Sequence, residues 1–348
     1  MAADEIKTFI AGMPKAELHV HLEGCMTPTL ARTLASRNNL PLPDSLASLD
    51  QSSGYSFHDL TSFLTVYYPN LGVLQTEVDF RDLALTYLTH AHSQNVLHVE
   101  LFFDPQAHTS RGIPFPTVLR GYRAGILTAQ RTLNMSASLI MCFLRDQSAE
   151  YAMATLMEAL PFKDSIIGIG LDSDERDNPP SKFAAAFQRA RKEGFLLTMH
   201  CDIDQPNSIQ HIRQAVEEIQ VDRIDHGTNI VEDPRLIDVA RDRGIGLTCC
   251  PVSNSIVTRD FKGREITSLL RAGVKVTVNS DDPAYFRAYA NENMEKMATD
   301  TDLTKQELIQ LQRNAFQISW ISTWRRNHFL QKLDEYEKKT ITDLPNGA

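Results

Sequence analysis

Two histidines, two positions apart, stand in a short apolar run near the start of the chain. His19 and His21 belong to the stretch Ala-Glu-Leu-His-Val-His-Leu-Glu-Gly, which runs from Ala16 to Gly24. On a β-strand, residues i and i+2 point to the same face, so both imidazoles would face one way. Such a pair can supply half of a metal site, although a bare His-x-His is more often a pair of surface histidines. The choice between these interpretations depends on the rest of the chain.

Further histidines and carboxylates follow other apolar runs directly. His200 ends the run Gly-Phe-Leu-Leu-Thr-Met, Asp225 and His226 end a second run, and Asp281 and Asp282 come just after Val-Lys-Val-Thr-Val-Asn. The chain has only 11 histidines, and four of them lie at such positions. Each histidine alone would more often be structural, but that explanation weakens when all of them are taken together.

Three imidazoles and a carboxylate form a donor set that suits a first-row cation of borderline softness, above all Zn²⁺. A catalytic zinc leaves one position for water and lowers the pKa of that water to about 7. A further histidine and carboxylate nearby could hold the hydroxide and move protons. The residues therefore predict metal-assisted hydrolysis, and they leave the substrate open.

These side chains can meet only if the apolar runs are neighbouring strands. Short β-branched runs alternate with longer amphipathic ones, which predicts strands at residues 96–103, 137–143, 166–171, 195–200, 223–225, 246–250 and 274–279. Helices are expected between most of them, at residues 116–133, 149–160, 180–193, 209–219, 233–243 and 267–272. With the first strand this makes eight strands with crossover helices.

This alternation is the pattern of a (β/α)8 TIM barrel, with additional N- and C-terminal helices. In such a barrel the chemistry collects at the carboxyl ends of the strands, where the polar residues lie. A doubly wound open sheet is the competing fold, but no G-x-G-x-x-G follows any strand to support a dinucleotide-binding version. We expect one domain over residues 1–348.

Several local predictions accompany this fold. Ser56 to Asp59 has the form of a capping box at the start of a helix that Pro69 would end. Thr304 to Glu307 has the same form before a C-terminal helix. Glu100 is expected near the barrel mouth, and the charged tail from Asp334 is expected to be frayed.

The bulk composition excludes some classes of function. The net charge is -9 without a basic run, which gives no electrostatic footprint for nucleic acid. There is no apolar stretch long enough to span a membrane and no secretory signal at the start, so we expect a cytoplasmic protein, with the nucleus as a second location. The five cysteines are scattered and odd in number, as is typical of reduced thiols inside a cell.

The sequence resembles the adenosine/adenine deaminase family of the amidohydrolase superfamily, and is most similar to the adenine deaminase branch. The likeness runs from Met13 to Phe316. Its most specific stretches are Met13-Pro-Lys-Ala-Glu-Leu-His-Val-His-Leu-Glu-Gly24, Val99-Glu-Leu-Phe-Phe-Asp-Pro-Gln106, Gly170-Leu-Asp-Ser173, Arg223-Ile-Asp-His-Gly227, Cys250-Pro-Val-Ser-Asn254 and Asn279-Ser-Asp-Asp-Pro-Ala-Tyr-Phe286.

The resemblance implies a barrel that binds one zinc ion per chain. The residues that match the metal ligands are His19, His21, His200 and Asp281. His226 matches the residue that holds the attacking hydroxide, and Asp282 matches the carboxylate that bonds the purine at N7. Glu23 is a candidate to hold the metal ligands in place without binding the metal itself. Phe63, Leu64 and Tyr67 could touch the substrate or could be ordinary packing residues of their helix.

The chain departs from the family at one critical place. The family's fifth-strand motif is His-Ala-Gly-Glu, whose glutamate gives a proton to N1 of the purine, and Ile203 stands at that position here. The interval from His200 to His226 is also about two positions longer than in the adenine deaminase pattern. Asp204 is the first candidate for the missing acid, and Asp202 is the second.

The leading reaction is therefore hydrolysis of adenine to hypoxanthine and ammonia. A remodelled loop could instead serve an N6-substituted adenine or another aminopurine. The non-enzymatic alternative is a zinc-binding pseudoenzyme that has lost its proton donor. A small purine base is the expected partner, neither nucleic acid nor membrane is expected, and the oligomeric state stays open.

Overall fold

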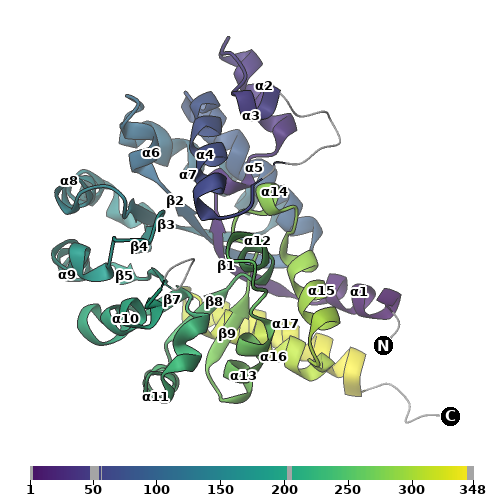
Figure 1. The fold of residues 1–348 in the computed structure, drawn as a ribbon. Coiled ribbons are helices and arrows are strands. Elements are labelled where there is room, and N and C mark those ends of the chain that lie inside the picture. Colours follow the sequence, from purple (N-terminus) through teal and green to yellow (C-terminus); the bar gives the residue numbers. More distant parts are fainter. Residues whose placement is uncertain (1–2, 48–54, 56, 202–205, 343–348) are drawn as a thin grey trace.

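Short parallel strands follow one another around a closed barrel with helices on its outside (Figure 1). The computed structural model describes residues 3–47, 55, 57–201 and 206–342. The strands of this described part are β1 (Lys15–His21), β2 (Val96–Phe103), β3 (Ser136–Leu144), β4 (Gly168–Asp172), β5 (Leu196–Leu197), β6 (His200–Cys201), β7 (Arg223–His226), β8 (Gly246–Cys249) and β9 (Lys275–Val278). They pair in the order β1 to β5 and β6 to β9, always in parallel.

Backbone hydrogen bonds join the two runs of strands at both junctions. β5 and β6 are two halves of one barrel strand, because Thr198 N–H donates to Ile169 O on one side and Asp225 N–H donates to Met199 O on the other (3.0 and 2.8 Å). At the second junction, His21 N–H donates to Asp281 O and Asp281 N–H donates to His19 O (2.9 and 3.1 Å). The barrel therefore has eight strand positions, as the sequence predicts.

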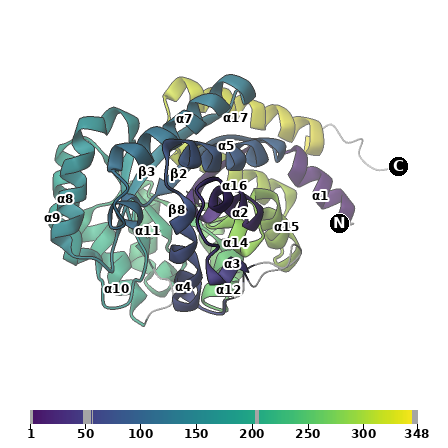
Figure 2. The same cartoon turned by 90° about the horizontal axis from the view of Figure 1, so that it is seen from above.

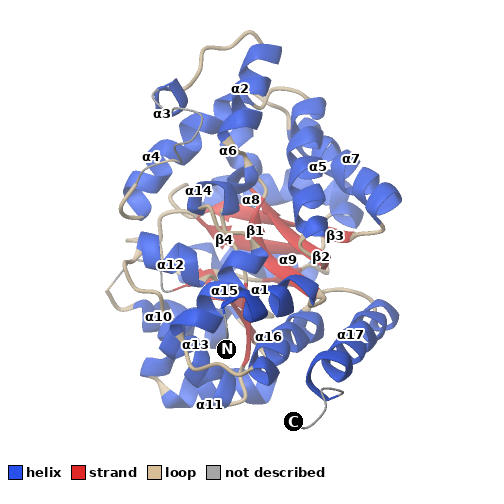
Figure 3. Ribbon diagram, turned by 90° about the vertical axis from the view of Figure 1, so that its right-hand side faces the viewer, coloured by secondary structure: helices blue, strands red, loops and turns tan. Residues whose placement is uncertain are grey.

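Helices cover the outside of the barrel, and the strands lie at its centre (Figure 3). The helices that follow successive strands are α6 (Pro105–Thr109), α7 (Phe115–Leu133), α8 (Ala149–Ala159), α9 (Ala184–Lys192), α10 (Ser208–Arg213), α11 (Pro234–Arg243), α12 (Pro251–Val257), α13 (Gly263–Arg271) and α14 (Pro283–Phe286). α10 continues into a π-helical turn at Gln214–Ile219. The predicted crossover helices agree with these bounds to within a few residues.

Additional helices extend the barrel at both ends of the chain. They are α1 (Ala3–Gly12), α2 (Pro28–Arg37), α3 (Asp44–Ala47), α4 (Leu60–Asn70), α5 (Glu77–Ser93), α15 (Ala290–Asp300), α16 (Lys305–Ile318) and α17 (Thr323–Glu337). α1 and α17 meet through Phe9 and Tyr336, whose hydroxyl donates to Phe9 O (2.5 Å), and both lie on one side of the molecule (Figure 2). No helix of the described residues is long and apolar enough to cross a membrane.

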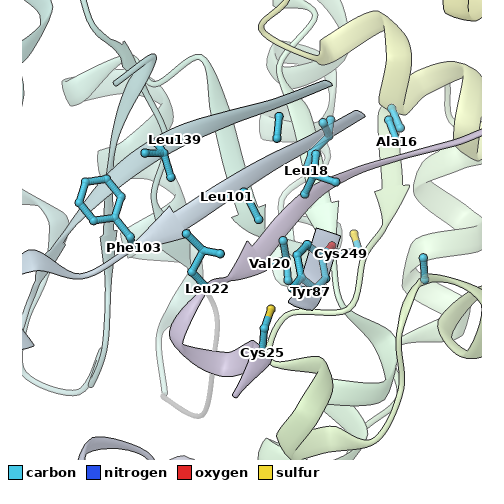
Figure 4. Packing of buried hydrophobic residues seen from close by; sticks show 14 of the residues in the cluster. Ala16, Leu18, Val20, Leu22, Cys25, Tyr87, Leu101, Phe103, Leu139 and Cys249 are labelled. Carbon is cyan, nitrogen blue, oxygen red and sulfur yellow. The ribbon is translucent and has the colours of Figure 1, made fainter. Parts of the chain in front are cut away.

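The core lies mainly between the strands and the outer helices. Leu18 and Val20 of β1 pack with Leu101 of β2, Cys249 of β8 and Tyr87 of α5 (Figure 4). Burying one such aliphatic side chain contributes about 1.5–3 kcal/mol, so this layer holds β1 firmly. His19 and His21 alternate with Leu18 and Val20 along β1, so the two imidazoles are held in a fixed position.

A polar cluster fills the lower end of the barrel, which is the end where the strands begin. Glu100 accepts hydrogen bonds from the Arg223 guanidinium, from His98 and from the backbone N–H of Trp320. The guanidinium carbon lies 3.9 Å from the centre of the Trp320 ring. The placement of Glu100 near the barrel mouth was wrong: its partner Arg223 is the first residue of β7, at the amino-terminal end of the strands, and its partner Trp320 follows α16.

Four local predictions need comment. α4 begins at Leu60, and its capping box is formed by Asp59 and Ser62, three residues later than predicted; Ser56 lies outside the described residues. Pro69 does not end α4 but lies within its last turn, where the helix runs on to Asn70. The Thr304–Glu307 capping box is confirmed. The tail is not frayed from Asp334, because α17 and a π-helical turn continue to Thr342.

Candidate metal centre and pocket

The barrel brings most of the predicted site residues together at the carboxyl ends of its strands. His21 and His226 are the last residues of β1 and β7, and His200 lies in β6. Asp281 and Asp282 follow β9, and Asp281 is bonded to β1 at the barrel junction. All five side chains are at least nine-tenths buried. Asp202 and Asp204 lie outside the described residues.

The histidines are fixed through their Nδ1 atoms. His200 Nδ1–H donates to Leu171 O (3.0 Å), and His226 Nδ1–H donates to Asn254 Oδ1 (2.9 Å). His19 Nδ1 lies 3.0 Å from the Thr248 hydroxyl, which itself donates to Asp225. Because carbonyl oxygens only accept, the proton of each anchored ring is on Nδ1, and the Nε2 lone pair is free for a cation.

The free Nε2 atoms converge on Asp281. His19 Nε2 and His21 Nε2 lie 3.2 and 3.4 Å from Asp281 Oδ1, and His21 Nε2 lies 3.1 Å from His200 Nε2. Ligands 2.0–2.1 Å from a tetrahedral zinc are separated by about 3.3 Å, so these distances match the edges of such a site. Two bare lone pairs 3.1 Å apart would repel each other, and a cation between them removes that repulsion.

His226 stands beside this group of four. Its Nε2 lies 3.7 Å from Asp281 Oδ2, and, like His19 Nε2, it has no hydrogen-bond partner among the described residues. His19, His200, His226 and Asp281 also bring ligand atoms within 4.8 Å of one another. The shorter distances favour His21 over His226 as the third imidazole in contact with a metal. Buried donors without partners are what a metal centre requires.

Burial controls the charge of the histidines. It lowers the pKa of His21 to about 4 and that of His226 to about 3, and neighbouring imidazoles help lower the pKa of His200 well below its usual value. Burial also lowers the pKa of His19, but the carboxylates of Asp281 and Asp225 outweigh it and raise that pKa overall. Three of the four rings are therefore neutral at pH 7 and ready to bind a cation.

Asp281 and Asp282 are adjacent but have opposite electrostatic environments. Burial favours the neutral form of Asp281, but the surrounding histidines outweigh burial and hold its pKa well below the usual value. The Ser253 hydroxyl also donates to Asp281 Oδ2 (2.6 Å). Burial and the Asp281 charge raise the pKa of Asp282 well above its usual value. Asp282 can therefore carry a proton and donate it in a hydrogen bond.

Backbone strain is concentrated in the same place. His226 and Asp281 adopt φ values of 60° and 65°, in the left-handed region that non-glycine residues seldom occupy. Each such conformation costs on the order of 1 kcal/mol and is kept only where the surrounding structure imposes it. Here it turns two side chains from different strands toward one point.

A pocket opens above the metal centre. About 540 Å³ of empty space, part of it continuous with solvent, lies among His21, His200, His226, Asp281 and Asp282 on one side. Its other walls are mainly apolar and come from α4 and from two later segments, with the residues Leu60, Phe63, Leu64, Tyr67, Val257 and Phe286. The α4 residues singled out in the sequence thus line the pocket. The Tyr68 hydroxyl donates to Ser173 Oγ (2.8 Å) and joins α4 to the segment after β4.

Three carboxyl groups in this pocket were missed by the sequence reasoning. Asp104 directly follows β2, Asp172 ends β4 and Glu175 lies three residues further on. Burial raises the pKa of Asp172 to about 7, and burial together with the Asp172 charge raises that of Asp104 well above its usual value. The rule that chemistry collects at strand ends would have found the two aspartates, whereas nothing in the pattern marks Glu175.

Supporting contacts surround the pocket. Arg145 is fully buried, and its guanidinium donates to His200 O (2.7 Å) and to Asn178 O. Glu175 lies 4.0 Å from this guanidinium and is bonded to His211 Nδ1 (2.8 Å). Glu23 accepts from His108 and Tyr122 (2.9 and 2.8 Å) rather than from any of the clustered histidines. Asp225, which accepts from Thr198 and Thr248, lies under His19 and His200 instead.

A parallel eight-position barrel with buried imidazoles and a carboxylate at its carboxyl face defines a class of metal-dependent hydrolases, the amidohydrolase superfamily. The model of one family within it, described as "Adenosine deaminase", matches residues 14–336. The chain belongs to the adenosine deaminase family.

Individual proteins agree with this membership. The chain is 50% identical to an uncharacterized deaminase of Schizosaccharomyces pombe, over 95% of this chain and 98% of that one. It is 46% identical to an adenine deaminase of Zymomonas mobilis, over 94% of this chain and 97% of that one.

Solved structures of the same fold include an adenine deaminase of Arthrobacter aurescens, with 38% identity, a TM-score of 0.89, and coverage of 94% of this chain and 100% of that one. A Burkholderia ambifaria amidohydrolase with bound zinc has 27% identity, a TM-score of 0.87, and coverage of 99% and 96%.

Proposed function

We propose that the chain catalyses the hydrolytic deamination of adenine to hypoxanthine and ammonia, with one zinc ion held by His19, His21, His200 and Asp281. The observation that carries this proposal is the chain of close contacts on the floor of a largely apolar pocket, in which Asp281 Oδ1 lies 3.2 and 3.4 Å from the Nε2 atoms of His19 and His21, and His21 Nε2 lies 3.1 Å from His200 Nε2. Adenine deaminases that are 38–46% identical over nearly the whole chain support adenine as the substrate.

The roles of the protein groups follow from their contacts. Zinc in a site of this type supplies a nucleophile at neutral pH by acidifying water. His226, fixed by Asn254 and with a free Nε2, orients the attacking oxygen toward C6 of the base. Asp282, whose raised pKa favours the protonated form, donates a hydrogen bond to N7 and withdraws electrons from the ring. The apolar residues of α4 cover the flat base and exclude water.

A carboxylic acid must also protonate N1 while the ring loses its aromaticity. We assign this role to Asp204, with Asp202 as the second choice, because both flank the family's glutamate position at Ile203. Glu175 is a third candidate, since its carboxyl group lines the pocket and lies close to the guanidinium that bonds His200 O. Its hydrogen bond to the part-buried His211 would give it a route for proton exchange with solvent.

The deciding experiment is an ammonia-release assay of the zinc-loaded protein with adenine, adenosine, AMP, N6-methyladenine and N6-isopentenyladenine. Because substituted bases release an amine rather than ammonia, the change in ring absorbance is followed in parallel. We expect adenine to have the highest kcat/KM. A preference for a substituted base would replace the proposed substrate, and no turnover of any compound by protein with stoichiometric zinc would point to the pseudoenzyme.

A further inference from the structure

Two carboxyl groups in the pocket have no role in the reaction proposed above. Asp104 and Asp172 are 2% and 3% exposed, and both line the pocket. One oxygen of each lies within 4.8 Å of the other and of a ring nitrogen of His21. They come from the ends of β2 and β4, two strands that are separated by β3.

Three of the four carboxyl oxygens of this pair have no hydrogen-bond partner among the described residues. Within the described residues, Asp104 Oδ1 and both oxygens of Asp172 are buried without a partner. His21 Nδ1 lies 3.5 Å from Asp172 Oδ2, at the limit of a hydrogen bond. Buried polar atoms are nearly always satisfied in a folded protein. A donor from a bound molecule is therefore expected at this place.

The position of the pair indicates which part of a ligand it meets. His21 lies between the pair and the metal centre, because its Nε2 faces Asp281 (3.4 Å) and its Nδ1 faces Asp172 (3.5 Å). Adenine has N–H donors only at its amino group and at the imidazole ring nitrogen N9. The amino group leaves during the reaction and has to lie at the metal centre. The N9–H, on the far edge of the base, remains for the carboxyl pair.

We propose that the carboxyl groups of Asp104 and Asp172 bind the N9–H of a free purine base and so select bases over nucleosides. The inference rests on the proposed function. In a nucleoside or nucleotide, N9 carries a sugar and no hydrogen. Binding of a nucleoside or nucleotide would leave the buried oxygens without a donor and would place the sugar against two carboxyl groups.

The test compares adenine with 9-methyladenine, which lacks the N9–H and adds only a methyl group. The zinc-loaded protein and its Asp104→Leu variant are assayed with both bases. We expect the unchanged protein to prefer adenine by about 10- to 100-fold in kcat/KM, because 9-methyladenine leaves buried acceptor oxygens without a donor. Leucine has the approximate size of aspartate but no acceptor, so Asp104→Leu is expected to reduce this preference at least several-fold without enlarging the pocket.

Two further variants separate hydrogen bonding from other effects. Asp104→Asn keeps an acceptor oxygen and is expected to retain most of the preference. Glu175→Gln changes another carboxyl group of the same pocket and is expected to leave the ratio of the two bases unchanged, whatever its effect on turnover. If Asp104→Leu keeps the full preference while adenine is still deaminated, the proposal is wrong.

Binding of the product provides a readout without turnover. Calorimetry of hypoxanthine and 9-methylhypoxanthine should give the same loss of preference in Asp104→Leu. If no protein turns over adenine, the proposed function fails and this binding ratio alone decides the inference. Metal content is measured in parallel: two metal ions per chain, of which Asp104→Leu loses one, would identify the pair with His21 as a second metal site and overturn the proposal.

Discussion

At the scale of single residues, the site depends on which nitrogen of each histidine is free. Thr248, Leu171 and Asn254 hold three Nδ1 atoms, and this leaves the Nε2 atoms to converge beside Asp281. The residue types that follow the strands could be read from the sequence, and so could the metal they suit. The anchors could not, because Leu171 acts through a backbone carbonyl and Thr248 has no distinguishing neighbour in the chain.

Asp281 carries the negative charge of the proposed metal site. Asp281→Ala removes the oxygen that faces both His19 and His21 and leaves neutral imidazoles alone. We expect the variant to lose its zinc and at least a thousandfold in kcat. Metal analysis and the deamination assay check this, with Asp238→Ala, at a well-exposed position of α11, as the control. Full activity in a metal-free variant would refute the assignment of the site.

The proton donor is the second residue-scale prediction. Asp204→Asn is expected to keep stoichiometric zinc and to lose two to four orders of magnitude in kcat, the usual contribution of a general acid. Asp202→Asn and Glu175→Gln are expected to have smaller effects. The three variants are compared by single-turnover kinetics at saturating adenine. A larger loss of kcat in Asp202→Asn or Glu175→Gln would assign the role of proton donor to that residue instead.

At the scale of elements, strand ends and the segments after them create the pocket. The sequence pattern located the strands to within about two residues, because apolar runs and polar ends are both periodic features. It placed α4 correctly but shifted its start, since two overlapping sets of capping residues compete there and only the structure shows that Asp59 and Ser62 are used. The carboxyl groups of Asp104 and Asp172 also lie at strand ends. The sequence analysis overlooked them because it concentrated on the strand ends that carry histidines and on Asp281 and Asp282.

Gly24 shows how closely the segment after β1 approaches the end of β9. A Cβ atom at Gly24 would lie 1.9 Å from Asp282 Oδ1 and 2.8 Å from its Cα, so both side chain and backbone would have to shift. We expect Gly24→Ala to raise KM for adenine at least tenfold and to cost about 1–3 kcal/mol of stability. Gly72→Ala, where a Cβ would meet nothing within 4 Å, is the control. An unchanged KM would argue against a role of Asp282 in binding.

Lys15 links α1 to the barrel and predicts a pH dependence. Its buried ammonium donates to Ile10 O and Met13 O (both 2.7 Å), and burial lowers its pKa to about 7. Between pH 7 and 10 the unfolded lysine holds a proton that the folded one has lost, so stability rises with pH. Relative to Lys15→Met, the unchanged protein should gain roughly 3 kcal/mol across this range.

Urea unfolding at pH 7, 8.5 and 10 measures this difference. Lys7→Met, at an exposed position of α1, is the control. A stability difference between the unchanged protein and Lys15→Met that stays constant with pH would show that Lys15 keeps its charge in the folded state.

At the scale of the whole molecule, chemistry lies at one end of the barrel and a structural ion pair at the other. The sequence predicted eight strand positions, and the structure and its relatives confirm that barrel. The sequence could not place Glu100. Strand alternation predicts which residues face inward, but it does not predict the height along the barrel axis at which a partner such as Arg223 lies. The expected single domain and the cytoplasmic or nuclear location stay predictions.

The ion pair at the lower end gives the whole-molecule prediction. Arg223→Met leaves the Glu100 carboxylate buried, with His98 and the Trp320 N–H as its remaining donors in the described part of the chain. We expect a loss of about 3–5 kcal/mol in the free energy of unfolding, the usual effect of removing one partner of a buried pair. Denaturant unfolding checks this. The double variant Arg223→Met/Glu100→Gln should recover part of the loss, and no recovery would mean that the arginine acts through its contact with Trp320 instead.

The junction where β1 meets the segment after β9 has a consequence for how the protein is made. His19 and His21 leave the ribosome early, whereas Asp281, the residue that bonds to both of their backbones, is translated about 260 residues later. At about 5–20 residues per second, this is an interval of roughly 13–50 seconds. During that time the nascent chain carries histidines without their carboxylate partner and β1 without its neighbour on one side. The proposed metal centre can therefore be completed only late in biosynthesis, and a chain released before Asp281 lacks one of its four proposed ligands.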